Sequence, residues 1–414
     1  MVPKDRPTIL QIVPQLDAGG AELSAVEIAE AIVRSGGRAL VLSEPGRLTP
    51  RVTAVGGEAI AFPAATKNPF KLLANARAIR RITVTEGVDL IHARSRAPAW
   101  SALLAARQAA VPFVTTYHGA YGETNALKKL YNSVMARGDV VIANSRYTAD
   151  LIASRYAVPR ERLELIHRGV DVSAFDPQGI APDRVAELRH RWGVAPEQRV
   201  ILQAARLTRW KGQGVLIDAV GRLQRRGALE GAVAILAGDA QGRDAYVKEL
   251  QAQIERLGLK EHVRLVGHVE DVAAAYAASH VTVVASIEPE AFGRTAIEAT
   301  AVACPVIATN IGAPSETVMA QPTVVQGEIT GWLVPPSDAE ALAHSLAAVL
   351  ALTSAERPAM GERARRHVLA NFTTEAMQRR TLVVYDRLLG TALVNSFNAV
   401  MPGNVPRRES SRQP

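Results

Sequence analysis

The chain has 414 residues, of which 48% are hydrophobic, 21% charged and 5% aromatic; it is longer than the roughly 250–300 residues that one hydrophobic core supports, so two domains are expected. The low aromatic content argues against a surface that stacks on nucleic-acid bases. The 48 lysines and arginines outnumber the 40 acidic residues, and the net charge of +8 favours an anionic partner, whether a nucleotide, a phospholipid surface or a nucleic acid.

The first half of the chain alternates short apolar runs with longer amphipathic ones, as expected for strands and helices in turn. Because the strand runs do not alternate apolar with polar residues, they read as buried strands and indicate a parallel, doubly wound sheet. The predicted strands are Thr8–Val13, Arg38–Leu42, Asp89–His92, Phe113–Tyr117 and Val140–Ala143. The predicted helices are Ala21–Arg34, Leu72–Glu86, Pro98–Ala109 and Tyr147–Tyr156.

A second series of the same kind follows an irregular stretch near residues 170–190. Its predicted strands are Arg199–Ala204, Val233–Ala237, Val263–Val266, Val281–Ala285 and Pro305–Thr309. We therefore predict an α/β fold of two Rossmann-like, doubly wound domains, residues 1–180 and 181–375, with the working site in a cleft between them. A long helix is predicted over Thr374–Leu389, and residues 400–414 are expected to form a disordered tail.

Two motifs in the first domain are candidates for ligand binding. Gly19 and Gly20 join the first strand to the first helix, where paired glycines and a helix N-terminus can approach a phosphate closely, although an ordinary tight turn would use the same residues. His118 follows a predicted strand directly, at the edge where open α/β sheets bind ligands. A lone histidine at a strand end is more often structural, and this reading is favoured more strongly for His92.

In the second domain, two cations follow the first strand. Arg206 and Lys211 can converge on one diphosphate, the arginine as a planar fork and the lysine as a point charge. The alternative is a solvated basic loop, which is the more usual role of such a run and the one expected for Arg209.

The stretch SIEPEAFGRTAIEA, from Ser286 to Ala299, places two carboxylates around a predicted helix start. Free amide groups at a helix start suit phosphate, and carboxylates accept hydrogen bonds from hydroxyl groups. One nucleotide sugar would use the whole stretch, with hexose hydroxyls at Glu290, phosphates at the turn and ribose hydroxyls at Glu298.

Four motifs, in order and with their spacing, resemble the GT-B glycosyltransferases of the large retaining family four over most of residues 8–390. The motifs are Gly19-Gly20, His118-Gly119, Arg206 with Lys211, and Glu290 with Glu298. The resemblance implies an acceptor-binding first domain, a nucleotide-sugar-binding second domain and a helix over residues 376–392 that crosses back to the first domain. It also implies a UDP- or GDP-linked donor, retention of anomeric configuration, and no metal or other cofactor.

The same resemblance assigns roles to single residues. His118 would lie beside the transferred sugar, Arg206 and Lys211 would neutralise the diphosphate, and Glu290 would bind hexose hydroxyls; these four form the catalytic set. The donor-binding set is Gly19, Gly20, Arg206, Lys211, Val269, Phe292, Gly293, Arg294, Thr295 and Glu298. Asn144-Ser145 resembles an acceptor-side motif. An additional acid, Glu288, precedes Pro289. Either Glu288 or Glu290 could therefore correspond to the family's first carboxylate.

Two other functions stay open on the sequence alone. A sugar-nucleotide epimerase has the same architecture, but it would require carboxylates in both domains. A non-catalytic protein that binds nucleic acid or anionic lipid would account for the charge, although no basic patch interleaved with aromatic residues supports nucleic acid.

A basic segment without acidic residues in the first domain predicts contact with an anionic membrane surface. Between Phe62 and Thr85, apolar residues alternate with Lys67, Lys71, Arg77, Arg80 and Arg81. The segment LKKLY over Leu127–Tyr131 is similar, and a solvated face over a buried stripe is the alternative for both.

The location of the protein is predicted from what the sequence lacks. There is no secretory signal at the N-terminus and no run of about 18 apolar residues, so a cytoplasmic protein is expected, peripheral on the inner membrane face at most. Cys304 is the only cysteine, which excludes a disulfide within the chain. The expected acceptor is a glycan or lipid-linked glycan, such as a lipopolysaccharide core or another envelope glycan.

Overall fold

The computed structural model describes residues 6–17, 19–66, 68–229 and 231–400, and within them the chain forms two compact units. The first unit contains the described residues up to Asn144, Ala149–Ile166 and the chain from Glu375 onward. The second unit contains Ser145–Thr148 and His167–Thr374. Lys67 and residues 401–414 of the expected tail lie outside the described residues.

The first unit is built on a seven-stranded sheet of parallel neighbours in the order β3-β2-β1-β4-β5-β6-β7. The strands are β1 (Thr8–Gln15), β2 (Arg38–Glu44), β3 (Glu58–Ala61), β4 (Leu90–Ala93), β5 (Phe113–Tyr117), β6 (Val140–Ala143) and β7 (Leu163–Leu165). The sequence did not predict β3 or β7, because these edge strands are short, only partly buried and without a continuous apolar run.

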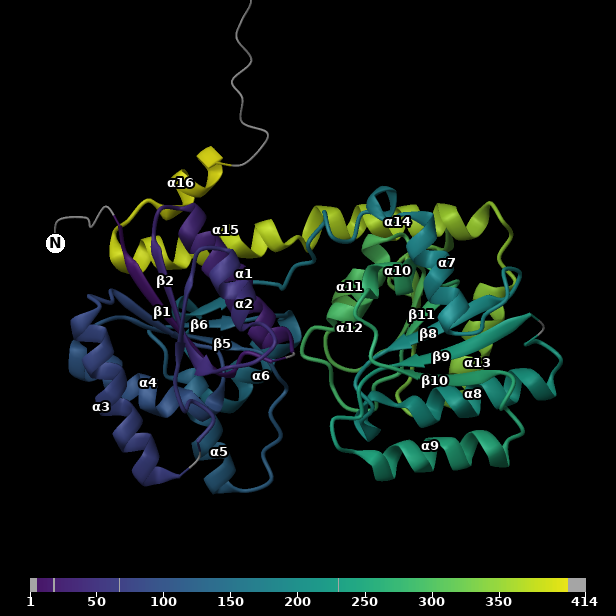
Figure 1. Ribbon diagram of the computed structural model, residues 1–414, viewed down its shortest axis with the longest axis horizontal. Coiled ribbons are helices and arrows are strands. Elements are labelled where there is room, and N and C mark those ends of the chain that lie inside the picture. The colour runs from purple at the N-terminus through teal and green to yellow at the C-terminus, as the bar shows by residue number, and fades with distance from the viewer. Residues whose placement is uncertain (1–5, 18, 67, 230, 401–414) are drawn as a thin grey trace, which may run out of the picture. The chain divides into compact units, whose positions relative to one another are not determined.

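Helices cover both faces of this sheet (Figure 1). Its helices are α1 (Gly20–Arg34), α2 (Thr49–Ala54), α3 (Pro69–Thr85), α4 (Arg96–Ala109), α5 (Ala126–Asn132), α6 (Arg146–Tyr156, whose first turn belongs to the second unit), α15 (Thr374–Leu389) and α16 (Leu393–Val400). Ile28 of α1, Tyr385 of α15 and Phe397 of α16 pack in one core layer. Ile79 of α3 and Leu103 of α4 pack in the other.

The buried His92 connects α15 to the sheet. Its Nδ1 lies 2.6 Å from the Tyr385 hydroxyl and its Nε2 lies 2.7 Å from the Thr116 hydroxyl. Burial lowers the pKa of His92 well below its usual value, so the ring is neutral and each nitrogen has a hydrogen-bonding neighbour. His92 therefore has the structural role that its sequence context favoured.

The second unit has a six-stranded sheet of parallel neighbours in the order β10-β9-β8-β11-β12-β13. The strands are β8 (Arg199–Ala204), β9 (Ala232–Ala237), β10 (Val263–Gly267), β11 (Val281–Val284), β12 (Val306–Thr309) and β13 (Gly331–Val334). The helices are α7 (Pro182–Arg191), α8 (Gln213–Arg225), α9 (Asp244–Arg256), α10 (Val272–Ala277), α11 (Arg294–Ala301), α12 (Pro314–Thr317), α13 (Ala339–Leu350) and α14 (Glu356–Asn371). The two Rossmann-like folds that the sequence predicted are both present.

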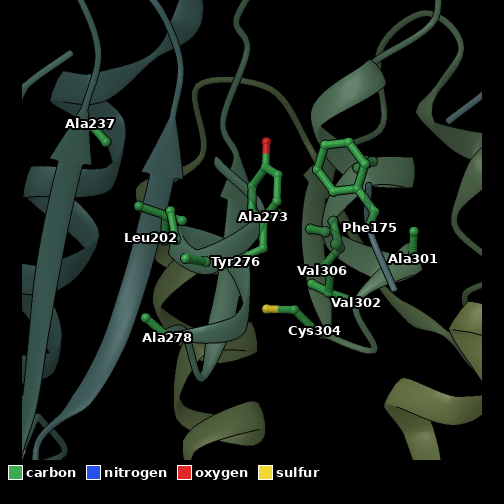
Figure 2. Packing of buried hydrophobic residues seen from close by; sticks show 14 of the residues in the cluster. Phe175, Leu202, Ala237, Ala273, Tyr276, Ala278, Ala301, Val302, Cys304 and Val306 are labelled. Carbon is green, nitrogen blue, oxygen red and sulfur yellow. The ribbon is translucent and has the colours of Figure 1, made fainter. Parts of the chain in front are cut away.

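Two core layers also flank the second sheet. One contains residues of α8, α9 and α13, and the other contains residues of α7, α10, α11 and α14. Figure 2 shows part of the second layer, where Tyr276 and Phe175 pack among alanine and valine side chains with their ring centroids 6.2 Å apart. Across the described residues, no helix is both long enough and apolar enough to cross a membrane.

Candidate active site

Two loops meet at the centre of the second sheet. Strands β8 and β11 are neighbours there, but the chain continues from β8 into α8 on one face and from β11 into α11 on the other. This is the topological switch point, beyond whose strand ends open α/β sheets bind their ligands. The loop after β8 carries Arg206 and Lys211, and the loop after β11 carries Glu290.

Gly212 brings the two loops together. It has a φ of +70°, and a Cβ at this position would lie 1.9 Å from the carbonyl oxygen of Ala285, so no other residue fits without backbone movement. A backbone hydrogen bond of 2.8 Å from Ile287 to the Trp210 carbonyl joins the loops on the other side of Lys211. Lys211 is thereby held against the loop that follows β11.

Lys211 and Ser286 converge on one carboxylate oxygen. The Lys211 ammonium forms an ion pair with Oε1 of Glu290, and the Ser286 hydroxyl donates a 2.5 Å hydrogen bond to the same oxygen. The three side chains are nearly buried, and the Lys211 Nζ also lies 4.1 Å from the Trp210 ring centroid. Because a carboxylate has two oxygens, Oε2 of Glu290 is left to accept hydrogen bonds from a ligand.

The backbone of Glu290 is fixed as well. Its carbonyl accepts a 2.9 Å hydrogen bond from Ala313, and its amide donates a 3.3 Å bond to Ile311. Gly312, with a φ of +87°, passes so close that a Cβ there would lie 2.2 Å from the Glu290 carbonyl oxygen. Glu288, two residues earlier, is exposed and is not part of this contact, so the buried acid beside Lys211 is Glu290.

The second carboxylate lies one turn into α11. Glu298 accepts a 3.1 Å hydrogen bond from Nε of Arg294 and a 3.3 Å bond from the hydroxyl of Tyr276. Burial, with the Glu298 charge nearby, raises the pKa of Tyr276 well above its usual value, so the tyrosine remains a proton donor to the carboxylate. Gly293 is the N-cap residue of this helix, and Thr295 lies in its first turn.

The remaining candidates of the second unit differ in exposure. Arg206 is exposed and forms no ion pair with a residue that the structure describes. The Phe292 side chain is buried, with its ring centroid 5.9 Å from that of Phe372, so the ring belongs to the core of the second unit. Val269 follows the edge strand β10 and packs partly against the core.

The candidates of the first unit lie beyond the carboxyl ends of the strands of the first sheet. Gly20 begins α1 after β1, and Gly19 is its N-cap residue. His118 follows β5 directly and is partly buried. Asn144 is buried beyond β6. The next residue, Ser145, belongs to the second unit, and its hydroxyl accepts a 3.0 Å hydrogen bond from the Thr148 amide at the start of α6.

Sequence reasoning missed Ser286 and Glu316. Ser286 stands at the end of a predicted strand, beside the acidic stretch, and its position at a strand end was the signal that could have identified it. Glu316 of α12 accepts hydrogen bonds from the Arg146 amide at 2.8 Å, the Tyr147 amide at 2.9 Å and His167 Nε2 at 3.0 Å. Its partners are 149 to 170 residues away in the chain, so no local pattern reveals it.

Glu316 gives a pH-dependent prediction. Burial alone would raise the pKa of its carboxyl, but hydrogen bonds from His167 and the two amides outweigh burial and lower it. A lowered folded-state pKa stabilises the protein above the unfolded-state pKa of about 4.3, and this stabilisation is lost as the pH falls through the folded-state value. We expect Glu316→Gln to reduce the free energy of unfolding by roughly 1–3 kcal/mol at pH 7.

Urea denaturation of the Glu316→Gln variant between pH 3 and pH 7 measures this effect. The free energies of unfolding of the variant and the unsubstituted protein should converge below about pH 4, where the Glu316 carboxyl of the unsubstituted protein becomes protonated and its stabilising effect is lost. Glu288→Gln, which replaces an exposed carboxylate, serves as the control and should have the same free energy of unfolding as the unsubstituted protein throughout this pH range. If the free energy lost in Glu316→Gln is the same at every pH, the lowered pKa of Glu316 is contradicted.

The fold and this grouping of residues define a class. Two Rossmann-like units, the second with cations, carboxylates and a helix N-terminus at its switch point, are the architecture of a GT-B glycosyltransferase. Family comparisons agree: the family described as Glycosyltransferase Family 4 matches residues 18–174, and Glycosyl transferases group 1 matches residues 185–367. The chain therefore belongs to the family-four glycosyltransferases, enzymes that transfer a sugar from a nucleotide sugar.

Individual proteins are similar over nearly the whole chain. A glycosyltransferase of Rickettsia africae is 33% identical, with a TM-score of 0.84 over 94% of this chain and 100% of that one. HepE of Anabaena, solved in complex with UDP-glucose, is 26% identical, with a TM-score of 0.79 over 92% of this chain and 100% of that one. A D-inositol 3-phosphate glycosyltransferase of Jonesia denitrificans is 27% identical over 92% of this chain and 94% of its own length.

Proposed function

We propose that this protein is a retaining, metal-independent hexosyltransferase that moves a sugar from a UDP- or GDP-linked donor to a glycan or lipid-linked glycan. The observation that carries the proposal is the contact of Lys211 and Ser286 with one oxygen of Glu290, at the switch point and on the same loops as Arg206 and the start of α11. A diphosphate needs cations, and a hexose needs hydrogen-bond acceptors; this site offers both side by side.

The diphosphate would be bound by Arg206, Lys211 and the amide groups after Gly293. Negative charge develops on the diphosphate as the bond to the sugar breaks, and fixed cations stabilise that charge without reorganisation. Two protein cations can do this in place of a divalent metal ion, which supports the metal-independent mechanism. Retention of configuration is supported by membership of family four.

The hexose would be bound by Glu290. Its Oε1 is already occupied by Lys211 and Ser286, so the free Oε2 would accept hydroxyl protons of the sugar. The ammonium of Lys211, which contacts Glu290, would also face the departing phosphate and so connect sugar binding with leaving-group stabilisation. In the first unit, His118 would hydrogen-bond to the transferred sugar, and the Gly19-Gly20 turn would lie against the phosphates.

Glu298 would bind the ribose, and the backbone near Val269 would bind the base. Arg294 and Tyr276 orient the Glu298 carboxylate, which retains acceptor capacity for two ribose hydroxyls. The donor complex of HepE with UDP-glucose supports a donor of the same chemical class.

The acceptor that we propose is a lipid-linked glycan of the cell envelope, such as a lipopolysaccharide core, reached at the cytoplasmic membrane face. An inositol phosphate is the second candidate, because the relative from Jonesia denitrificans carries that substrate in its name.

Incubation of the purified protein with a panel of UDP- and GDP-sugars tests the proposal. The true donor should raise the unfolding temperature, because binding to the native state stabilises it by mass action, and should release free nucleoside diphosphate equally with and without a chelator. With a soluble acceptor, NMR of the product should show the anomeric configuration of the donor. A product that is an epimer of the intact donor, or no thermal shift with any donor, would contradict the proposal.

A further inference from the structure

Three neighbouring helices of the first unit carry basic residues and no acidic ones. Helices α3, α4 and α5 contain no aspartate or glutamate. Their cations are Lys71, Arg77, Arg80, Arg81, Arg96, Arg107, Lys128 and Lys129, as many positive charges as the whole chain has in excess. Such an uneven distribution creates a strong local field around one part of the surface.

Most of the exposed large hydrophobic side chains lie on the same helices. Among the described residues, these side chains are Phe70, Leu73, Val84, Leu104, Leu127, Leu130, Val325 and Val383, and the first six belong to α3, α4 and α5. Phe70 is 83% exposed and Leu127 78%. Isolated exposed apolar residues are common, but a group of them on one face indicates an interaction surface.

Hydrogen bonds bring the three helices together. On α4, Ser101 donates a 2.9 Å bond to the carbonyl of Leu72 in α3, and its neighbour Trp100 donates a 3.1 Å bond to the carbonyl of Tyr131 in α5. The first turn of α3 and the last turn of α5 therefore lie on one turn of α4. Figure 1 shows α3, α4 and α5 on the side of the sheet away from α1, α15 and α16. Their exposed side chains form what we name the apolar–basic face.

The cations of the apolar–basic face are available to a partner. Six of them are exposed and form no ion pair with any described residue: Lys71, Arg77, Arg80, Arg81, Lys128 and Lys129. Along α3, positions 70, 73, 77, 81 and 84 recur at helical spacing on its solvent side, so apolar and basic side chains share one stripe. The stripe is about 21 Å long, given the rise of roughly 1.5 Å per residue.

From this arrangement we infer that the apolar–basic face docks on an anionic phospholipid bilayer, with the cations among the headgroups and Phe70, Leu73, Leu127 and Leu130 inserted shallowly. Cations attract anionic headgroups, and apolar side chains at the same level enter the boundary of the acyl chains. A two-fold dimer through this face would place like charges opposite one another, which disfavours a second copy as the occupant. The purpose of docking, which is access to a lipid-linked acceptor, rests on the proposed function. The docking itself is inferred from the charge and exposure of these helices alone.

Co-sedimentation with vesicles tests the inference. The full chain should bind vesicles of phosphatidylcholine with 30% phosphatidylglycerol, should not bind pure phosphatidylcholine, and should be released by 0.5 M salt, where charges are screened over a few ångströms. Lys71/Arg80/Lys128/Lys129→Gln should lower the partition coefficient by roughly 10³-fold. Phe70/Leu127→Ser should lower it about tenfold with the cations intact.

Matched variants control for charge and hydrophobicity. Arg225/Lys248/Arg256/Arg379→Gln removes the same number of exposed cations from other helices, and Val383→Ser removes an exposed apolar side chain from α15. Both should bind vesicles like the unsubstituted protein. All the substituted side chains are exposed, so every variant should keep its unfolding temperature.

Three results would overturn the inference. They are equal binding to neutral and anionic vesicles, equal losses in the matched charge control, and tight binding of single-stranded DNA without binding of anionic vesicles. Hydrolysis of the nucleotide sugar in solution is measured in parallel. Vesicle binding without hydrolysis would support membrane docking by the apolar–basic face and contradict the proposed transferase. Hydrolysis without vesicle binding would support the transferase and contradict membrane docking.

Discussion

Arg206→Ala should lower the turnover of the nucleotide sugar by a factor of about 10²–10³, because a preorganised cation is removed from the developing charge of the diphosphate. Arg206 is exposed and forms no ion pair with the described residues, so its removal should leave the fold intact. Lys211→Ala should also reduce turnover, but it leaves the nearly buried Glu290 without its ion-pair partner and should therefore lower stability too.

Arg209→Ala is the matched control for Arg206. It removes a guanidinium from the same loop, but this one pairs with Glu249 and lies 5.2 Å from the centroid of the Tyr246 ring. We expect its turnover to stay within about twofold of the unsubstituted enzyme, as for a surface ion pair. Steady-state release of nucleoside diphosphate gives all three values. Turnover close to that of the native enzyme in both Arg206→Ala and Lys211→Ala would rule out the diphosphate clamp.

The two carboxylates should divide the donor between them. Glu298→Gln should weaken binding of the free nucleoside diphosphate by roughly 10- to 100-fold, since hydrogen bonds to a charged acceptor are lost at the ribose. Glu290→Gln should leave that affinity unchanged or raise it, because Lys211 loses its carboxylate partner and can interact more strongly with the phosphate, while transfer falls by at least about 10²-fold.

Titration calorimetry with the nucleoside diphosphate, combined with transfer rates, separates the two roles. Glu288→Gln, two residues from Glu290 but exposed, should change neither quantity. Ser286→Ala should lower transfer less than Glu290→Gln, and Ser286→Thr, which retains the hydroxyl, should restore it. The opposite pattern, with diphosphate binding lost in Glu290→Gln and kept in Glu298→Gln, would exchange the roles of the two acids.

The central parts of both sheets could be predicted from the sequence. Strands β4, β5, β6 and β11 are buried along their whole length, and their apolar and β-branched residues do not alternate with charged ones, so this burial is visible in local composition. Edge strands such as β3 and β7 are partly exposed, so their residues are mixed and no local pattern marks them. The solvent exposure of Phe70 and Leu73 on α3 was not predictable either, because a helix of this composition can turn its apolar residues toward the core or away from it.

The sequence by itself determined the two-domain α/β organisation, the family resemblance and the residue types of the candidate site. These follow from periodicity and from short motifs, which are local properties of the chain. Only the tertiary structure decided that Lys211 and Ser286 hold the same oxygen of Glu290, that Glu288 stays outside, and that Glu316 binds the start of α6. Contacts between residues tens to hundreds of positions apart depend on strand order and on the close approach of loops at glycines such as Gly212 and Gly312, which local sequence does not encode.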